Sequence, residues 1–272
     1  MMKNIIRGIM VFSALAGALA WSAQTLSAQA PSTPVPSTPS TPSAQTASAD
    51  AVSTPTADEI VSKNLTAIGG KEAISQVKSI SMETSVQVMG NDAPSTTVIV
   101  DGVGARTETD FNGSKMVQCY NDKGGWSVNP MAGAADPTPM PEDEYNAGKE
   151  QIHVGGGLYD YSARGSKVEL LGKDAGTYKL KLTTKENIET TYVLDASTYL
   201  IKSVLRKGKF QGQDVDITTN FSDYRKTDAG YLIPYSMDVD FGGQFQLSIA
   251  LKKVELNKTV DPAIFVMPKA GM

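Results

Sequence analysis

The stretch that decides the fold is YLIPYSMDVDFGGQFQLSIAL, residues 231–251. Apolar side chains occupy every second position through residues 231–241, and a second alternating run covers residues 245–251. Because successive side chains of a strand point to opposite faces of a sheet, each run predicts a strand with one apolar face and one face in water. Gly242 and Gly243 separate the two runs and favour the turn of an antiparallel hairpin.

The same two-residue period returns along most of the chain. The second run of the hairpin changes phase at Lys252 and Lys253, which predicts a β-bulge there. Ten or so antiparallel strands, spaced about 4.8 Å apart, form an open sheet so wide that its twist makes it curl. The other predicted strands lie near residues 80–88, 97–100, 105–111, 115–120, 125–128, 168–171, 178–182, 190–194, 199–205 and 214–221. The fold class is therefore mainly β (α+β), built on one large curved antiparallel sheet.

Few helices are available to cover the apolar face of this sheet. Asp58 is a plausible N-cap for one short amphipathic helix that ends at Gly69 and Gly70, and a further helical turn is expected over residues 71–77. Two architectures satisfy this pattern. Either the sheet closes into a packed barrel, or it stays half open around an apolar hollow.

The middle of the chain interrupts the alternation. Residues 130–165 contain four prolines, with a helical pattern over residues 142–151 before Gly155-Gly156-Gly157. A connection of about 35 residues far exceeds the usual four to six, and long connections are often lids or binding loops. We expect a lid whose contacts with the apolar face come from Met140, Tyr145, Ile152 and Leu158. The alternative is a helix packed permanently into the barrel.

The N-terminal part of the chain carries the pattern of an export signal. Residues 1–30 combine early basic residues, an apolar stretch and a small-residue end, which predicts a secretory signal peptide and an exported protein, with a retained membrane anchor as the alternative. Residues 31–57 are rich in Pro, Ser and Thr, so we expect a disordered linker. Residues 58–272 then form one domain.

Composition excludes several function classes. Acidic residues outnumber basic ones 29 to 25, and no long basic cluster is present, so nucleic acid is not an expected partner. The single histidine, His153, and the single cysteine, Cys119, cannot supply a multi-ligand metal site, and we expect no metal or other cofactor. His153 is interpreted as a surface-loop residue and Cys119 as a strand residue. Without a nucleophile motif, a hydrolase acting on a hydrophobic envelope substrate is disfavoured.

Several short motifs resemble those of LolA-like periplasmic carriers of outer-membrane lipoproteins. They are Ala67-Ile68-Gly69-Gly70, a strand carrying Arg106, Asn112-Gly113, Gly125-Trp126-Ser127-Val128-Asn129-Pro130, Phe221-Ser222-Asp223-Tyr224-Arg225-Lys226, Ile233-Pro234, Val254-Glu255-Leu256-Asn257 and Phe265-Val266-Met267-Pro268. The resemblance covers most of residues 58–268. It implies an eleven-stranded half-open barrel with a helical lid and an acyl-chain cavity, and it implies that Arg106 holds the lid closed.

The resemblance, together with the export signal and the apolar face, implies a non-enzymatic periplasmic carrier or chaperone that binds acyl chains of lipoproteins or other lipids for outer-membrane sorting. A membrane protein as donor or acceptor and a monomeric state are expected. The alternative is a lipid-sensing or protein-interaction signalling domain of the same fold. The expected cavity residues are Val86, Val88, Phe111, Trp126, Tyr178, Leu180, Tyr192, Ile217, Phe221, Tyr235, Met237, Phe245 and Leu247.

Overall fold

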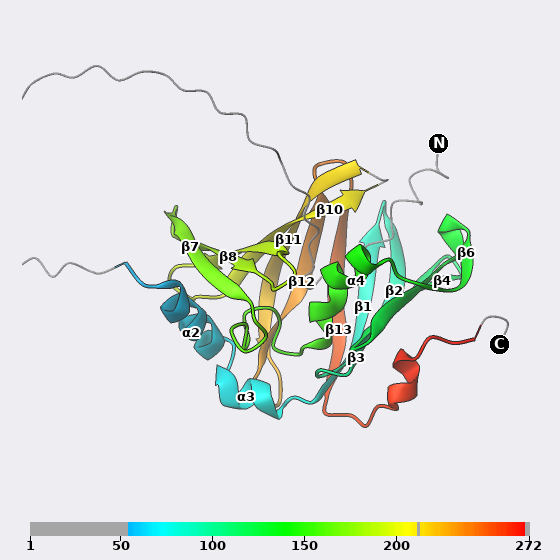
Figure 1. Cartoon of the computed structure of the whole chain (residues 1–272), viewed down its shortest axis with the longest axis horizontal. Helices are drawn as coiled ribbons and strands as arrows, with labels where there is room; N and C mark the ends of the chain where they lie inside the picture. The colour runs from blue at the N-terminus through cyan, green and yellow to red at the C-terminus, as the bar shows by residue number, and fades with distance from the viewer. Residues whose placement is uncertain (1–53, 211–212, 270–272) are drawn as a thin grey trace, which may run out of the picture. The chain divides into compact units, whose positions relative to one another are not determined.

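The computed structural model describes residues 54–210 and 213–269 (Figure 1). The expected signal peptide lies outside the described residues, as does the linker up to residue 53. The helices are α2 (Ala57–Ala67), α3 (Gly70–Gln76), η1 (Pro130–Ala132), α4 (Glu142–Gly148), η2 (Lys149–Ile152) and η3 (Pro262–Phe265). The strands are β1 (Ser79–Val88), β2 (Asn91–Val100), β3 (Gly104–Phe111), β4 (Ser114–Asn121), β5 (Gly124–Asn129), β6 (Ala134–Pro139), β7 (Lys167–Asp174), β8 (Thr177–Thr183), β9 (Glu189–Asp195), β10 (Ile201–Phe210), β11 (Gln213–Lys226), β12 (Leu232–Phe241) and β13 (Gln246–Leu256).

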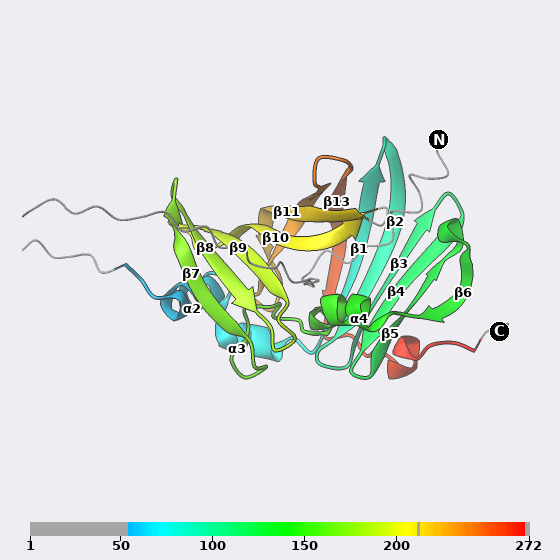
Figure 2. The same cartoon turned by 45° about the horizontal axis from the view of Figure 1, so that its top comes forward.

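All strands of the described residues join one antiparallel sheet. Its order is β6-β5-β4-β3-β2-β1-β13-β12-β11-β10-β9-β8-β7, so β6 and β7 are its two edges. The sheet curves without closing, and Figure 2 shows β7–β9 and β3–β6 as two flanks with α4 between them. Of the two architectures that the sequence pattern allows, the sheet therefore adopts the half-open one, which is also the one that the resemblance implies.

The sheet has thirteen strands, one more than the twelve runs predicted from the alternation and two more than the eleven that the resemblance implies. The difference includes β6, which contains Pro137 and Pro139 and lies in the segment interpreted as irregular. Proline cannot donate to a strand ladder, but an edge strand tolerates it because one side of the strand has no partner. The prolines that concealed β6 in the sequence are therefore compatible with its edge position.

The hairpin of residues 231–251 forms as its pattern predicts. Strand β12 pairs with β13, with Asp240 opposite Gln246. On its other side β13 pairs with β1, where Glu83 faces Lys253 and Thr84 faces Leu251. Lys252 is thus the extra residue of a bulge, at the position where the apolar alternation changes phase.

Topology forces the middle segment across the open side of the sheet. Strands β6 and β7 follow each other in the chain but lie at opposite edges. Residues 140–166, here called the strap, must therefore reach from one edge to the other, and α4 and η2 lie on this path (Figure 2).

Helix α2 starts two residues earlier than expected. Thr56, not Asp58, is the N-cap. Its hydroxyl accepts a hydrogen bond from the Glu59 amide, and its own amide donates one to the Glu59 carboxylate. This reciprocal capping box satisfies two backbone groups that would otherwise be unpaired. The helix buries Ile60 and Leu65 against the inner face of the sheet.

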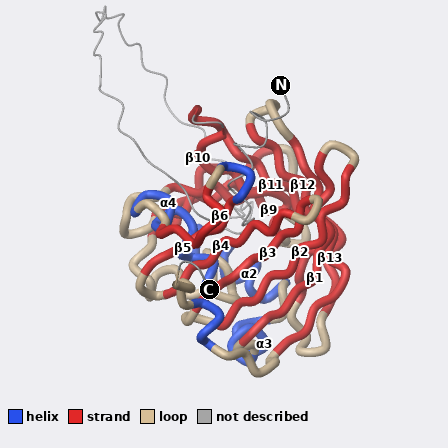
Figure 3. Tube along the Cα trace, turned by 90° about the vertical axis from the view of Figure 1, so that its right-hand side faces the viewer, coloured by secondary structure: helices blue, strands red, loops and turns tan. Residues whose placement is uncertain are grey.

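Within residues 54–210 and 213–269, the buried apolar side chains form three clusters. The main cluster joins α2, α3 and the strap to the inner face of the sheet. The distal cluster lies farther along the same face, on β1 and β10–β13, and includes Phe210, Phe241 and Phe245. The outer cluster lies on the opposite face, where Phe265 of η3 packs against Trp126 and Cys119. Figure 3 shows the C-terminal helix on the outer side of β3 and β4.

Candidate functional site

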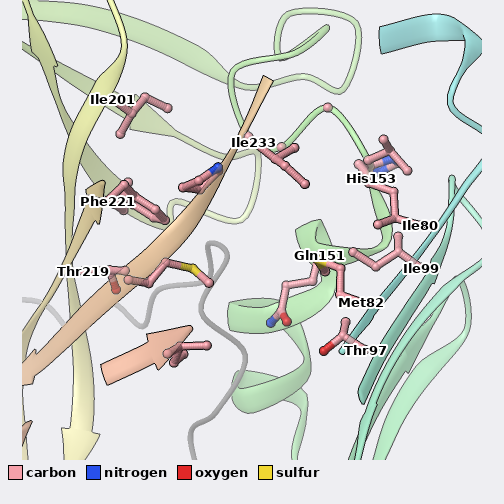
Figure 4. A pocket seen from close by; sticks show the side chains of 18 of the residues that line it. Ile80, Met82, Thr97, Ile99, Gln151, His153, Ile201, Thr219, Phe221 and Ile233 are labelled. Carbon is pink, nitrogen blue, oxygen red and sulfur yellow. The ribbon is translucent and has the colours of Figure 1, made fainter. Parts of the chain in front are cut away.

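The inner face of the sheet contains a cavity of about 220 Å³. By the same measure a single water needs roughly 10–15 Å³, so this space far exceeds a packing defect. One wall comes from β1–β3 and the other from β10–β12. In Figure 4, Ile201, Phe221 and Ile233 face Ile80 and Ile99 across the space.

The cavity lining is mostly apolar and includes a belt of hydroxyl groups. The aliphatic and sulfur-containing side chains come from Ile68, Ile80, Met82, Val86, Ile99, Ile201, Val204, Ile233, Met237 and Ile249. Cross-strand bonds join several hydroxyls, including Thr97 to Thr107 at 2.9 Å and Ser95 to Thr109 at 2.8 Å. These hydroxyl groups partner each other, so they lower the polarity that a guest meets.

Backbone bonds on one side of the cavity anchor the strap. The Gly102 amide donates to the Ile152 carbonyl at 2.9 Å, and the Val154 amide donates to the Asp101 carboxylate at 3.0 Å. The Tyr231 hydroxyl donates to the Val154 carbonyl at 3.2 Å. Hydrogen bonding with His153, together with the Val154 amide, lowers the pKa of Asp101 despite partial burial. Residues 152–154 therefore attach the strap firmly beside the cavity.

A second attachment orders the glycine-rich part of the strap. Arg164 donates to the carbonyls of Gly156 and Gly157 at 2.9 and 3.0 Å, and its Nε lies 3.1 Å from Glu150. The Gly157 backbone approaches Tyr192 so closely that an added Cβ would lie 2.2 Å from the Tyr192 hydroxyl oxygen. Glycine is thus required there by close approach of the chain.

A polar group interrupts the apolar lining where the strap meets both flanks of the sheet. Arg206 of β10 is buried and lines the cavity beside Tyr192 and Gln151. Tyr192 and Tyr120 both interact electrostatically with Arg206, and Gln151 bonds to Tyr120. Burial raises the pKa of both tyrosines, and burial lowers the pKa of Arg206.

The structure brings some of the predicted site residues to this cavity. Those that line it are Val86, Tyr192, Phe221, Met237 and, from the strap, Leu158. Five others face the same side of the sheet but pack in the distal cluster, namely Val88, Phe111, Ile217, Phe245 and Leu247. They fill one end of the inner face with protein side chains.

The remaining predicted cavity residues pack elsewhere. Tyr178 and Leu180 are buried in the main cluster, and Tyr235 lies with its ring centre 4.4 Å from the Arg225 guanidinium. Trp126 lies in the outer cluster, because it pairs with Cys119 on the face opposite Tyr120. Alternation on the short β5 gave no sign of which face Trp126 would take.

The predicted lid residues all contact the sheet or its core. Met140 lies against Gly125, and Tyr145 donates to the Asn121 carbonyl at 2.9 Å. Ile152 and Leu158 are buried in the main cluster.

Arg106 lies on the outer face of the sheet. Ala105 and Thr107 line the cavity, so the residue between them points away from it. Arg106 forms an ion pair with Glu108 and lies with its guanidinium 5.8 Å from the Trp126 ring centre. The arginine that faces the strap from the inner side is Arg206. Strand geometry thus places Arg206, and not Arg106, on the cavity side of the sheet.

Sequence reasoning missed several residues of this site. His153 was interpreted as a surface residue, yet it is half-buried, lines the cavity and lies 3.9 Å from Asp101. Arg206 is absent from the predicted site residues, although it is in phase with the apolar Val204 on β10. That phase was the available signal. No sequence signal was available for Gln151 or for the glycines of residues 155–157, since their positions depend on the path of the strap.

Other classes of site find no support in the described ranges. Residues 54–210 and 213–269 contain no group of three or more His, Cys, Asp or Glu placed to hold a metal ion. In the same ranges, no helix has the length and apolar character needed to cross a membrane.

Comparison with known proteins identifies the fold. No family model and no curated protein matches the sequence. A LolA superfamily protein from Nitrosomonas europaea superposes with a TM-score of 0.53 at 11% identity, over 79% of this chain and 99% of its own. A DUF1329 family protein from Desulfovibrio piger gives 0.52 at 15% identity, over 78% and 98% of the two chains. A Vibrio parahaemolyticus domain assigned to outer membrane lipoprotein sorting gives 0.50 at 12% identity, over 77% and 97%. The chain therefore has a LolA-like fold.

Proposed function

We propose that this domain is a periplasmic carrier that binds acyl chains of lipoproteins or other lipids in the cavity between β1–β3 and β10–β12. The observation that carries the proposal is the space of about 220 Å³ left beneath the strap by mostly apolar walls. A protein interior normally fills such space with its own side chains. An unfilled apolar cavity is a standard site for an apolar guest.

The physical driving force favours an acyl chain. Each buried methylene contributes about 0.8 kcal/mol, so a dozen methylenes contribute roughly 10 kcal/mol before the costs of ordering are subtracted. Transfer to a membrane or partner then needs a competing apolar environment and an open strap. Movement of residues 140–166 is the proposed control step.

Two further features support a carrier. The fold is the one found in the LolA superfamily protein and in the lipoprotein-sorting domain described above. The export pattern of residues 1–30 agrees with a periplasmic location. We propose binding without turnover, because the cavity is lined by aliphatic groups and paired hydroxyls rather than by a nucleophile with its base.

A blocking variant tests the proposal. Thr97 points into the cavity (Figure 4), whereas its neighbour Thr96 is exposed on the other face of β2. Thr97→Trp is expected to fill part of the space and to weaken binding of a fluorescent fatty acyl probe at least tenfold. Thr96→Trp, the matched control, is expected to bind like the unmodified protein.

Native mass spectrometry of the protein purified from the periplasm provides the second measurement. Co-purified lipid, lost in Thr97→Trp and retained in Thr96→Trp, supports the carrier. An unmodified protein that neither retains lipid nor binds the acyl probe contradicts it. A stable protein partner captured without any lipid transfer would favour the interaction domain instead.

A further inference from the structure

The mostly apolar cavity has one fixed positive charge in its wall. Arg206 projects from β10 in phase with Val204, and the described residues that line the cavity include no Asp or Glu. Burial penalises the charge of Arg206, and an oxyanion beside the guanidinium would offset part of that cost. Its five donors suit a planar or tetrahedral oxyanion.

A neighbouring donor lacks an acceptor. The Tyr192 hydroxyl is buried and has no hydrogen-bond partner in the structure. On paired strands, Tyr192 lies opposite Val204, so its ring faces the same side of the sheet as Arg206. A buried hydroxyl without a partner costs about 1–3 kcal/mol relative to one that is satisfied. An acceptor oxygen at this point would remove that cost.

Arg206, Tyr192, Tyr120 and Gln151 together form a polar group at one end of the cavity, here called the corner. Tyr120 of β4 interacts electrostatically with Arg206, and Gln151 comes from η2, which follows α4. Two acidic residues of the strap act on these groups. Glu150, which acts on Tyr192, is paired with Arg164 at 3.1 Å, and burial raises the pKa of Glu144, which acts on Tyr120. The corner is therefore rich in donors, and it lies at one end of the aliphatic walls.

We infer that the cavity binds an amphiphile whose anionic oxygen-bearing head, a carboxylate or a phosphate, lies at Arg206 and Tyr192 while its acyl chain runs along the aliphatic walls. This inference rests on the proposed carrier function and names the chemical class of its cargo. An uncharged acyl ester would place only a carbonyl at the same corner. Charge-assisted hydrogen bonds are roughly twice as strong as neutral ones, so the site discriminates against the ester.

Two matched probe pairs test the inference in the full protein at pH 8, where dissolved carboxylic acids are ionised. The first pair is a fluorescent C18 fatty acid and its methyl ester. The second is hexadecyl phosphate and hexadecanol, used as competitors, so that the two head groups are compared directly. The unmodified protein is expected to bind each anion about ten- to a hundredfold more tightly than its neutral counterpart.

Three variants test whether the corner causes the preference for anionic over neutral probes. Arg206→Gln is expected to reduce this preference to less than threefold and to leave binding of the neutral probes intact. Tyr192→Phe is expected to weaken anion binding about three- to tenfold. Lys207→Gln removes the same charge from the adjacent position, which points to the outer face with a side chain 70% exposed, and is expected to change nothing.

The outcomes separate this inference from the carrier function. Equal affinity of the unmodified protein for acid and ester overturns the inference and leaves the carrier intact, whereas failure to bind any probe removes both. If Arg206→Gln does not fold, as judged by circular dichroism, then Arg206→Lys and Tyr192→Phe test the role of the corner instead. Lysine keeps the charge but loses the forked donor geometry, so both variants must lower the anion preference. An unchanged preference in both rejects the role of the corner.

Discussion

The indole Nε1 of Trp126 donates a 3.0 Å hydrogen bond to the carbonyl oxygen of Phe265. The same oxygen accepts a 3.0 Å bond from the Asn121 side chain and a longer one, at 3.5 Å, from the Cys119 thiol. The Phe265 ring lies over Gly104, where any Cβ would meet it at 2.5 Å. The C-terminal segment is thereby fixed on the outer face, opposite the cavity.

Gly104→Ala is expected to displace the Phe265 ring and to lower the free energy of unfolding by about 1–3 kcal/mol, because overpacking forces the contact apart. Urea unfolding followed by Trp126 fluorescence measures the change. Gly124→Ala is the matched control, since nothing lies within 4 Å of its added Cβ. Equal unfolding midpoints for the two variants would show that packing of the Phe265 ring does not require glycine at position 104.

Cys119 is expected to resist thiol reagents at pH 8 in the folded protein. Burial raises the pKa of its thiol to about 12, so almost no reactive thiolate is present. Labelling should therefore follow opening of the outer cluster, and Phe265→Ala should accelerate it at least tenfold. Maleimide labelling followed by intact mass measures the rate, with denatured protein as the fast reference. Rapid labelling of the unmodified protein is the contrary result.

A double-mutant cycle tests the contact between the strap and β9. Gly157→Ala places a Cβ 2.2 Å from the Tyr192 oxygen but 3.4 Å from the ring carbon that bears it. Alanine alone is expected to cost about 1–3 kcal/mol of stability. In the Tyr192→Phe background the oxygen is gone, so the cost should fall by more than half. Additive effects of the two substitutions would place the strap farther from Tyr192 than the structure does.

The attachment of the strap at Asp101 is expected to weaken in acid. Asp101 has a lowered pKa in the folded protein, so its stabilising contribution is complete above the unfolded value of about 3.9. That contribution is lost as the pH falls through the lower folded pKa. His153 and Lys78 are the charged or titratable partners that act on this carboxylate.

Hydrogen exchange of the Val154 amide measures this attachment, because that amide donates to Asp101. Asp101→Asn should exchange faster than the unmodified protein at pH 7, since the neutral side chain accepts a weaker bond. The difference should vanish below the folded pKa of Asp101. Asp214→Asn, on an exposed position of β11, controls for charge alone. Equal protection of the Val154 amide at pH 7 in Asp101→Asn and in the unmodified protein would show that Asp101 does not hold the strap.

Local pattern was sufficient for the strands whose two faces differ in polarity. The β12–β13 hairpin, the bulge at Lys252 and the helical start of the strap follow from period and turn residues that neighbours in the chain supply. The pattern was less informative for β5 and β6. Trp126 on a six-residue strand has too few neighbours to set a phase, and the prolines of β6 imitate a loop.

The sequence by itself determined that this chain forms a wide antiparallel sheet with one apolar face, because the two-residue period is a property of each strand alone. Only the tertiary structure decided how that face is used. Whether an apolar side chain packs in the distal cluster, as Phe245 does, or borders the cavity, as Phe221 does, depends on sheet curvature and on the path of the strap between β6 and β7. Arg206 reaches the cavity for the same reason, since contacts between residues distant in the chain set its surroundings.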